Sequence, residues 1–169
     1  MYFDIIRQFH HTLGNLDAIL EKAEAYAAER KFDVNNFMTA RLAPDMLPFS
    51  VQIRIACDAA KLAAANLSGQ VAPRHPDDET TFAELRGRIA KVREYLAGFK
   101  AEDFAGTAAD KLVPIPYPPG KGMQAQAFAL GRQVPNFFFH VSMTYALLRA
   151  GGVPIGKVDY LGALNIVDA

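Results

Sequence analysis

Apolar residues recur at spacings of three and four along four long stretches of this sequence, and this pattern constrains the fold more than any other feature. Side chains at this spacing lie on one face of an α-helix, and other elements must cover that face. We therefore expect amphipathic helices over residues 2–30, 43–67, 80–98 and 135–150. The clearest series, in the first of them, is Tyr2, Ile6, Phe9, Leu13, Leu16, Leu20, Ala23 and Ala27.

Proline and glycine mark where these helices begin and end. Pro44 suits a first helical turn, so the second helix is expected to start near residue 43, with Pro48 bending its first turns. Pro135 begins the fourth helix, and the pair Gly151-Gly152 ends it.

The chain between the third and fourth helices, residues 100–134, is expected to leave the bundle. Clusters of proline and glycine forbid a helix and favour turns, so we predict an extended excursion containing a β-hairpin with its turn near residues 119–122. Residues 153–169 are expected to form a mostly irregular tail. Together these elements predict an all-α four-helix bundle in a single domain. The breakers in the excursion are Pro114, Pro116, Pro118, Pro119, Gly120 and Gly122.

Composition excludes several classes of protein. The chain has 169 residues, 51% of them hydrophobic, which suits one globular domain. Its 18 basic residues balance 18 acidic ones, so no net charge attracts nucleic acid, and its apolar stretches are shorter than the roughly 20 residues that span a membrane. The single cysteine, Cys57, permits neither an internal disulfide nor a Cys-based zinc site. Without a signal-peptide pattern, we expect a cytoplasmic protein.

Polar residues on the predicted core stripes are the candidate site. Asn136 and His140 share a stripe of the fourth helix with apolar residues, and Asp45 and Gln52 share a stripe of the second. Both pairs lie near the start of their helices, so the four side chains would meet if those starts lie at the same end of the bundle. His140 would then be the proton-active group, oriented by Asp45, in a pocket for a small polar molecule. Outer members of this pocket would be Arg41 and Tyr145.

A purely structural interpretation of these residues is open as well. A buried polar group left unpaired costs roughly 1–3 kcal/mol, so it normally finds a partner without having a function. Asp45 could cap its own helix, Asn136 could brace the fourth helix, and His140 could bond to Asp45 or to a backbone carbonyl.

The spacing of possible ligands does not favour a metal site. From His140, the positions three and four residues on are Met143 and Thr144, which are poor ligands for a divalent ion. The adjacent His10 and His11 point in different directions on a helix, so they cannot chelate through one face. His75 lies in a loop beside acidic residues. Acidic residues in that position more often stabilise the amino terminus of a helix than bind a metal. We expect neither a metal nor another cofactor.

Three stretches, "RLAPDMLPFSVQ", "LSG" and "PNFFFHVSMTYALLRAGGVPIGKVDYLG", give the chain a family resemblance. It resembles the DUF1993 family, which is similar to DinB/YfiT-like four-helix bundles. The resemblance implies an up-down-down-up bundle, often a homodimer. Many DinB-like relatives hold a divalent metal with one histidine from helix two and an HxxxH pair on helix four. Here only His140 matches, Thr144 stands at the second position of the pair, and helix two offers Gln52.

Three functions follow from these observations, and whether the protein is an enzyme is left open. The leading one is a homodimeric, metal-free bundle protein that binds a small polar molecule near His140. The second is a metal-dependent transferase or hydrolase with a degenerate site, built from His140, a carboxylate and water. The third is a dimeric interaction module, whose surface is formed by the run Phe137–Phe139 and the carboxy-terminal tail.

Overall fold

The computed structural model describes residues 1–115 and 118–168, and four long helices form where the apolar spacing predicts them. They are α1 (Tyr2–Arg30), α2 (Phe49–Ser68), α3 (Phe82–Ala97) and α4 (Val134–Ala150). None of the helices in the described ranges is both long and apolar enough to cross a membrane.

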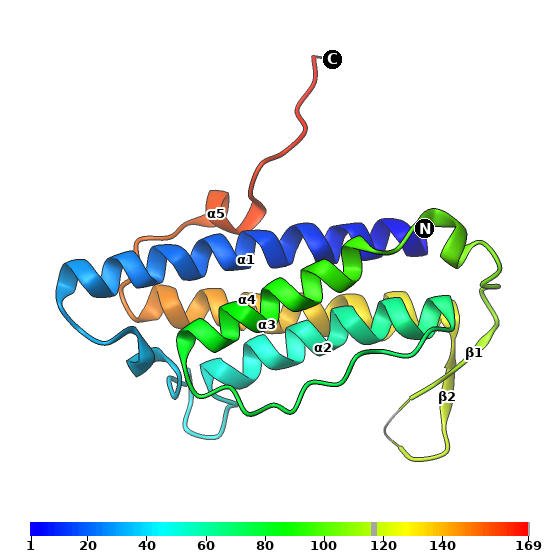
Figure 1. The fold of residues 1–169 in the computed structure, drawn as a ribbon, viewed down its shortest axis with the longest axis horizontal. Helices are drawn as coiled ribbons and strands as arrows, with labels where there is room; N and C mark the ends of the chain where they lie inside the picture. Colours follow the sequence, from blue (N-terminus) through cyan, green and yellow to red (C-terminus); the bar gives the residue numbers. More distant parts are fainter. Residues whose placement is uncertain (116–117, 169) are drawn as a thin grey trace.

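The helices form an up-down-down-up bundle, as the family resemblance implied. In Figure 1, α1 and α4 run in one direction while α2 and α3 run in the other, and residues 69–81 return along the bundle to connect α2 to α3. Helix α2 packs against both α3 and α4, and α1 packs against α3. Aromatic rings join these helices in the core. The ring centroids of Phe9 and Phe137 are 4.2 Å apart, and the rings of Phe49 and Phe82 are stacked with centroids 5.6 Å apart.

The second helix starts later than residue 43, which corrects the sequence prediction. Pro48 is its N-cap and has an extended backbone, with φ −71° and ψ 164°. The preceding residues around Pro44 form turns and bends rather than a first helical turn. Pro48 therefore begins the helix instead of bending it, in keeping with its fixed φ and its missing N–H donor.

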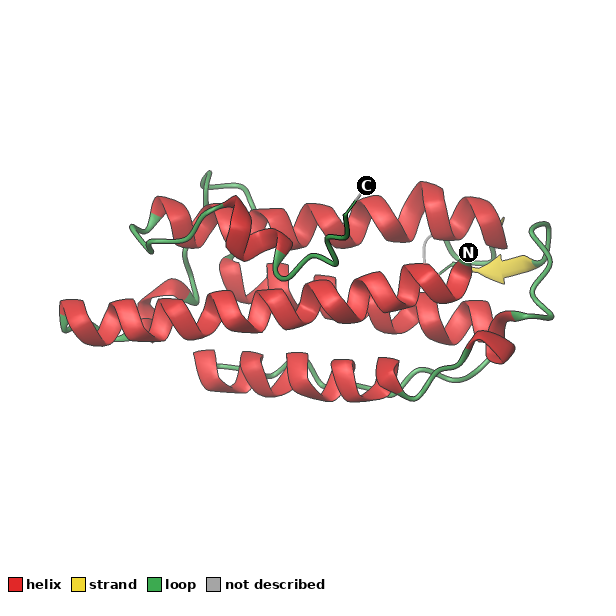
Figure 2. Ribbon diagram, turned by 90° about the horizontal axis from the view of Figure 1, so that it is seen from above, coloured by secondary structure: helices red, strands yellow, loops and turns green. Residues whose placement is uncertain are grey.

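The excursion contains the predicted hairpin but is shorter than residues 100–134. Strands β1 (Leu112–Pro114) and β2 (Gly122–Gln124) pair antiparallel, with Leu112 opposite Gln124. Before them lies a short 3₁₀ helix, η2 (Ala101–Phe104). After them the π-helical segment η3 (Ala127–Gln133) leads straight into α4. In Figure 2 the yellow arrow marks the position of the hairpin at one end of the bundle. Pro116 lies outside the described residues.

The carboxy-terminal tail is irregular except for one short helix, α5 (Lys157–Leu161), which lies on α1 (Figure 1). Asn15 of α1 donates hydrogen bonds to the carbonyl oxygens of Tyr160, at 3.2 Å, and Leu161, at 2.9 Å. Nε2 of His11 lies 3.2 Å from the same Leu161 oxygen. Gly162 follows with a φ of +66°, and a Cβ atom there would lie only 2.2 Å from Oδ1 of Asn15. Beyond this anchor the chain leaves the bundle.

Candidate functional site

Two of the predicted site residues, Gln52 and His140, meet between α2 and α4. Nδ1 of His140 lies 2.7 Å from Oε1 of Gln52, and the Gln52 amide nitrogen donates to the Leu47 carbonyl at 2.9 Å. Because an amide oxygen only accepts, Nδ1 of His140 carries the proton. The two residues are 7% and 2% exposed, and burial lowers the pKa of His140. Neutral His140 is thus satisfied by a neutral partner.

Asp45 does not join this pair, which corrects the expected meeting of four side chains. Because α2 and α4 are antiparallel, their amino-terminal ends lie at opposite ends of the bundle (Figure 1). Asp45 is exposed in the turn before α2, and the N-cap of that helix is Pro48. The hydrogen bond expected between Asp45 and His140 is therefore made by Gln52 instead.

The remaining predicted residues lie apart from one another. Arg41 is exposed and donates to the Met46 carbonyl. Asn136 is half-buried on α4. Tyr145 packs edge-on against Tyr160 of α5, with ring centroids 5.9 Å apart. Arg41 and Tyr145 thus each make a local structural contact, and within the described residues no hydrogen bond joins either of them to the pair Gln52 and His140.

The side chains at the metal position of DinB-like relatives do not fit a metal ion. The Thr144 hydroxyl donates to the carbonyl of His140 at 2.9 Å, so it is turned toward its own helix. Gln52 supplies an amide that already bonds to His140. One imidazole with these two neighbours is a weak donor set for zinc or a similar ion. Across residues 1–115 and 118–168, no three His, Cys, Asp or Glu side chains form a cluster that could hold a metal.

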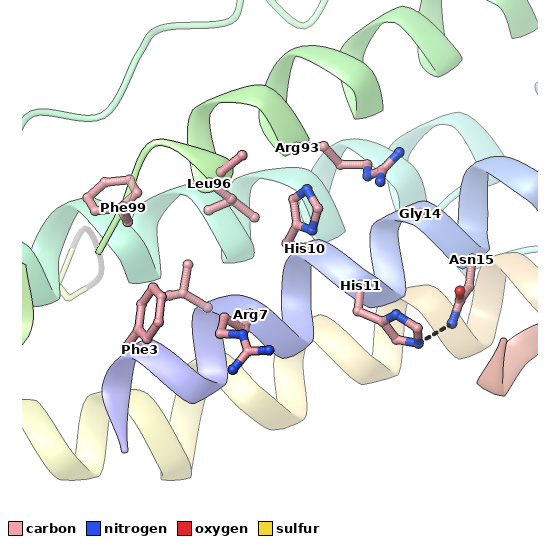
Figure 3. Close-up of a pocket in the computed structure, with 11 residues that line it drawn as sticks. Phe3, Arg7, His10, His11, Gly14, Asn15, Arg93, Leu96 and Phe99 are labelled. Atoms are coloured by element: carbon pink, nitrogen blue, oxygen red, sulfur yellow. Dashed lines mark hydrogen bonds between the residues drawn. The ribbon is translucent and has the colours of Figure 1, made fainter. Parts of the chain in front are cut away.

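A groove of about 540 Å³ lies between α1 and α3, and we call it the basic groove (Figure 3). Its size is within the range of small-molecule sites. The α1 residues repeat at helical spacing on one side, and Arg93 of α3 reaches across to them. Gly14 leaves room for this approach, since a Cβ atom there would lie 3.1 Å from the Arg93 guanidinium. The polar residues of the basic groove are Arg7, His10, His11, Asn15 and Arg93.

The basic groove carries positive charge without a matching carboxylate. No Asp or Glu is among the residues found to line it in the described part of the chain, and neither Arg7 nor Arg93 forms a salt bridge there. Nε of Arg93 is buried without a hydrogen-bond partner. Burial, Arg93 and His11, in that order, lower the pKa of His10. The Arg93 guanidinium thus already opposes a positive charge on His10.

Arg86 shows what Arg93 lacks. It lies two helical turns earlier on α3 and also reaches toward α1. There it bonds to Asp17 at 2.8 Å and to Glu24 at 2.6 Å, forming an ion pair with each. Arg93 instead lies beside His10 and Gly14 of α1, and no carboxylate among the described lining residues balances its charge. An anion bound there would pair with Arg93 as the carboxylates of Asp17 and Glu24 pair with Arg86.

Sequence reasoning missed the basic groove because it considered His10 and His11 only as ligands to a shared ion. A signal was present in the spacing of Arg7, His11 and Asn15, which places them on one face of α1. Arg93 could not be added from this spacing, because only the packing of α3 on α1 brings it near them.

Comparisons with known proteins agree with this fold. A family model described as "Domain of unknown function (DUF1993)" matches residues 1–161. The crystal structure of a DinB family member protein from Shewanella denitrificans is 44% identical in sequence. That similarity covers 99% of this chain and 95% of the other, with a TM-score of 0.93. A comparison with curated proteins gives no match.

Proposed function

This chain belongs to the DUF1993 family, and we propose that it uses its DinB-like bundle to bind a small anionic molecule in the basic groove. The observation that carries the proposal is the charge of one cavity. Two arginines without salt bridges in the described residues and two histidines line it, and no carboxylate was found there. Charge-assisted hydrogen bonds from guanidinium groups to a bound anion are among the stronger polar interactions in proteins.

The basic groove supports ligand binding better than the surroundings of His140 do. His140 is almost fully buried, and its Nδ1–H already donates to Gln52. By contrast, the groove is open to solvent, and among residues 1–115 and 118–168 no carboxylate forms a salt bridge with its arginines. The class of function expected from the sequence, a binding protein for a small polar molecule, is kept, but its place moves to α1 and α3. A metal-dependent reaction at His140 has little support, because the donor set there does not fit an ion.

Sulfate is a suitable probe, because it is small and keeps its charge near neutral pH. We expect a sulfate titration of isotope-labelled protein, followed by nuclear magnetic resonance, to give saturable shifts in residues 7–15 of α1 and 93–97 of α3. The variant Arg93→Gln should weaken binding about tenfold, since a hydrogen bond to a charged group contributes about 1.5 kcal/mol or more.

A matched control is Arg30→Gln. Arg30 is exposed in the last turn of α1, outside the basic groove, and forms no salt bridge within the described ranges. Its replacement removes the same charge and should leave sulfate affinity unchanged. Equal losses in both variants, or shifts spread over the whole charged surface, would show that sulfate responds to net charge and would reject the proposed site.

A further inference from the structure

The basic groove has an apolar end as well as a charged one. Because α1 and α3 are antiparallel, the start of α1 meets the end of α3, and Phe3 lies near Phe99 (Figure 3). Arg93 and His10 lie further along the groove. Phe3 and His10 are seven residues apart on α1, which corresponds to about 10 Å along the helix axis. The apolar lining residues are Phe3, Ile6, Leu96, Ala97 and Phe99.

Neighbouring rings hold this apolar end in place. Phe104 of η2 lies 6.3 Å from Phe3 and 5.7 Å from Phe99, measured between ring centroids. Tyr95 packs edge-on against Phe99 at 5.0 Å. Phe99 is buried, whereas Phe3 is only half-buried and so presents ring surface to the cavity. A ligand ring can pack on such a preformed aromatic surface without reorganising the bundle.

We propose that the ligand of the basic groove is an aromatic carboxylic acid, bound with its carboxylate at Arg93 and His10 and its ring against Phe3. This inference rests on the proposed function and adds the ligand class. An inorganic anion would meet only the charged end, and a neutral aromatic molecule only the apolar end. A compound with both groups uses both, over a distance that a ring with a short acidic side chain can cover.

The test compares four compounds on the unmodified full chain by calorimetric and magnetic resonance titration: 3-phenylpropionate, its neutral amide, propionate and sulfate. We expect 3-phenylpropionate to bind at least tenfold more tightly than each of the other three. Equal affinities of 3-phenylpropionate and propionate would overturn the inference and leave the proposed function standing. Failure of every anion to bind at the groove would reject both.

Two variants locate the ring. Phe3→Ala should weaken 3-phenylpropionate binding about tenfold and leave sulfate binding unchanged. Phe139→Ala is the matched control, because Phe139 is 52% exposed on α4, away from the groove, and its loss should change neither affinity. If circular dichroism shows that Phe3→Ala unfolds, Phe3→Leu is used in its place, with a smaller expected loss. An unchanged 3-phenylpropionate affinity in a folded Phe3 variant would overturn the assigned orientation.

Discussion

Burial lowers the pKa of both His10 and His140, but nearby positive charge adds to the effect only at His10. His140 hydrogen-bonds to the neutral Gln52, whereas the charge of Arg93 acts on His10. The two imidazoles therefore differ in what an incoming anion would do. An anion in the basic groove would offset the charge of Arg93 near His10 and favour the protonated form of His10, while His140 would be unaffected.

The affinity for sulfate should therefore depend on pH. Because bound sulfate favours the imidazolium form, the pKa of His10 is higher in the complex than in the free protein, and binding takes up protons. The affinity should rise as the pH falls through the neutral range, and level off below the lowered pKa of free His10, where the free protein is itself protonated. Sulfate titrations at several pH values, with the His10 ring resonances followed in parallel, measure this.

His10→Gln provides the comparison for this dependence. Its sulfate affinity should change less with pH, because the group with the lowered pKa has been removed from the groove. An affinity of the unmodified chain that is flat over this pH range would contradict the role given to His10.

At the scale of elements, a buried arginine attaches the long connection of residues 69–81 to the bundle. Arg88 of α3 is 2% exposed and donates to Asp58 of α2 at 2.9 Å and to Glu79 of the connection at 3.0 Å. It also bonds to Asp77, whose φ of 59° is unusual for a residue other than glycine. One side chain thus joins two helices and the segment that links them.

Replacing this arginine should be costly. Arg88→Met removes the buried cation that Glu79 and Asp58 share. Among the described residues, Glu79 then keeps only Arg54 and Asp58 only Lys61 as ion-pair partners. Breaking a buried ionic network of this kind costs roughly 3 kcal/mol. Denaturant unfolding followed by circular dichroism measures the change in the free energy of unfolding.

Arg86→Met is the control on the same helix. Its partners Asp17 and Glu24 are about one-third exposed, so its loss should cost no more than about 1 kcal/mol. Similar losses in the two variants would show that burial does not decide the strength of these ion pairs.

The elements themselves were largely predictable, because each long helix carries its own apolar stripe. The predictions that failed concern local structure that depends on contacts with other parts of the folded chain. The sequence placed the start of α2 near Pro44, with Pro48 as a bend, and only the folded chain shows that Pro48 begins the helix. The helical turns of η3 were missed because residues 127–133 follow a proline- and glycine-rich segment. There the buried Gln133 donates to the Ala59 carbonyl of α2 at 2.9 Å, a contact absent from the local sequence.

The candidate site was less predictable than the fold, for a related reason. Helical phase correctly brought His140 toward α2, but phase does not say which end of one helix meets which end of another. The antiparallel arrangement selects Gln52 and leaves Asp45 in an exposed turn. The basic groove combines residues from two helices, and sequence spacing on α1 alone shows only part of it.

At the scale of the whole molecule, large apolar side chains remain exposed at several places, among them the phenylalanine run and the carboxy-terminal tail. Phe137 is buried, Phe138 is half-buried and Phe139 is exposed, so the phenylalanine run divides between core and surface. In the tail, Leu164, Ile166 and Val167 are exposed beyond α5. Exposed apolar residues of this kind are candidates for contact with another chain, such as the second copy in the homodimer that the family resemblance implies.

Removing residues 163–169 tests whether the tail makes that contact. We expect the full chain to be a dimer by light scattering and the truncated chain to be a monomer, with the helical circular dichroism preserved because α5 remains. Phe139→Ser, made separately, asks whether the second surface contributes. A monomeric full chain would contradict the predicted dimer, and a truncated chain that stays dimeric would exclude the tail as its contact.

The anchor of α5 has one more consequence. His11 and Asn15 hold the backbone of Tyr160 and Leu161, and the same two side chains line the basic groove. A ligand that draws either side chain into the groove must weaken the contacts of that side chain with the backbone of Tyr160 and Leu161. By thermodynamic reciprocity, freeing that backbone changes the affinity for the ligand by the same factor. Ligand binding in the basic groove would thus change how tightly the carboxy-terminal segment is held on the other side of α1, without any movement of α1 itself.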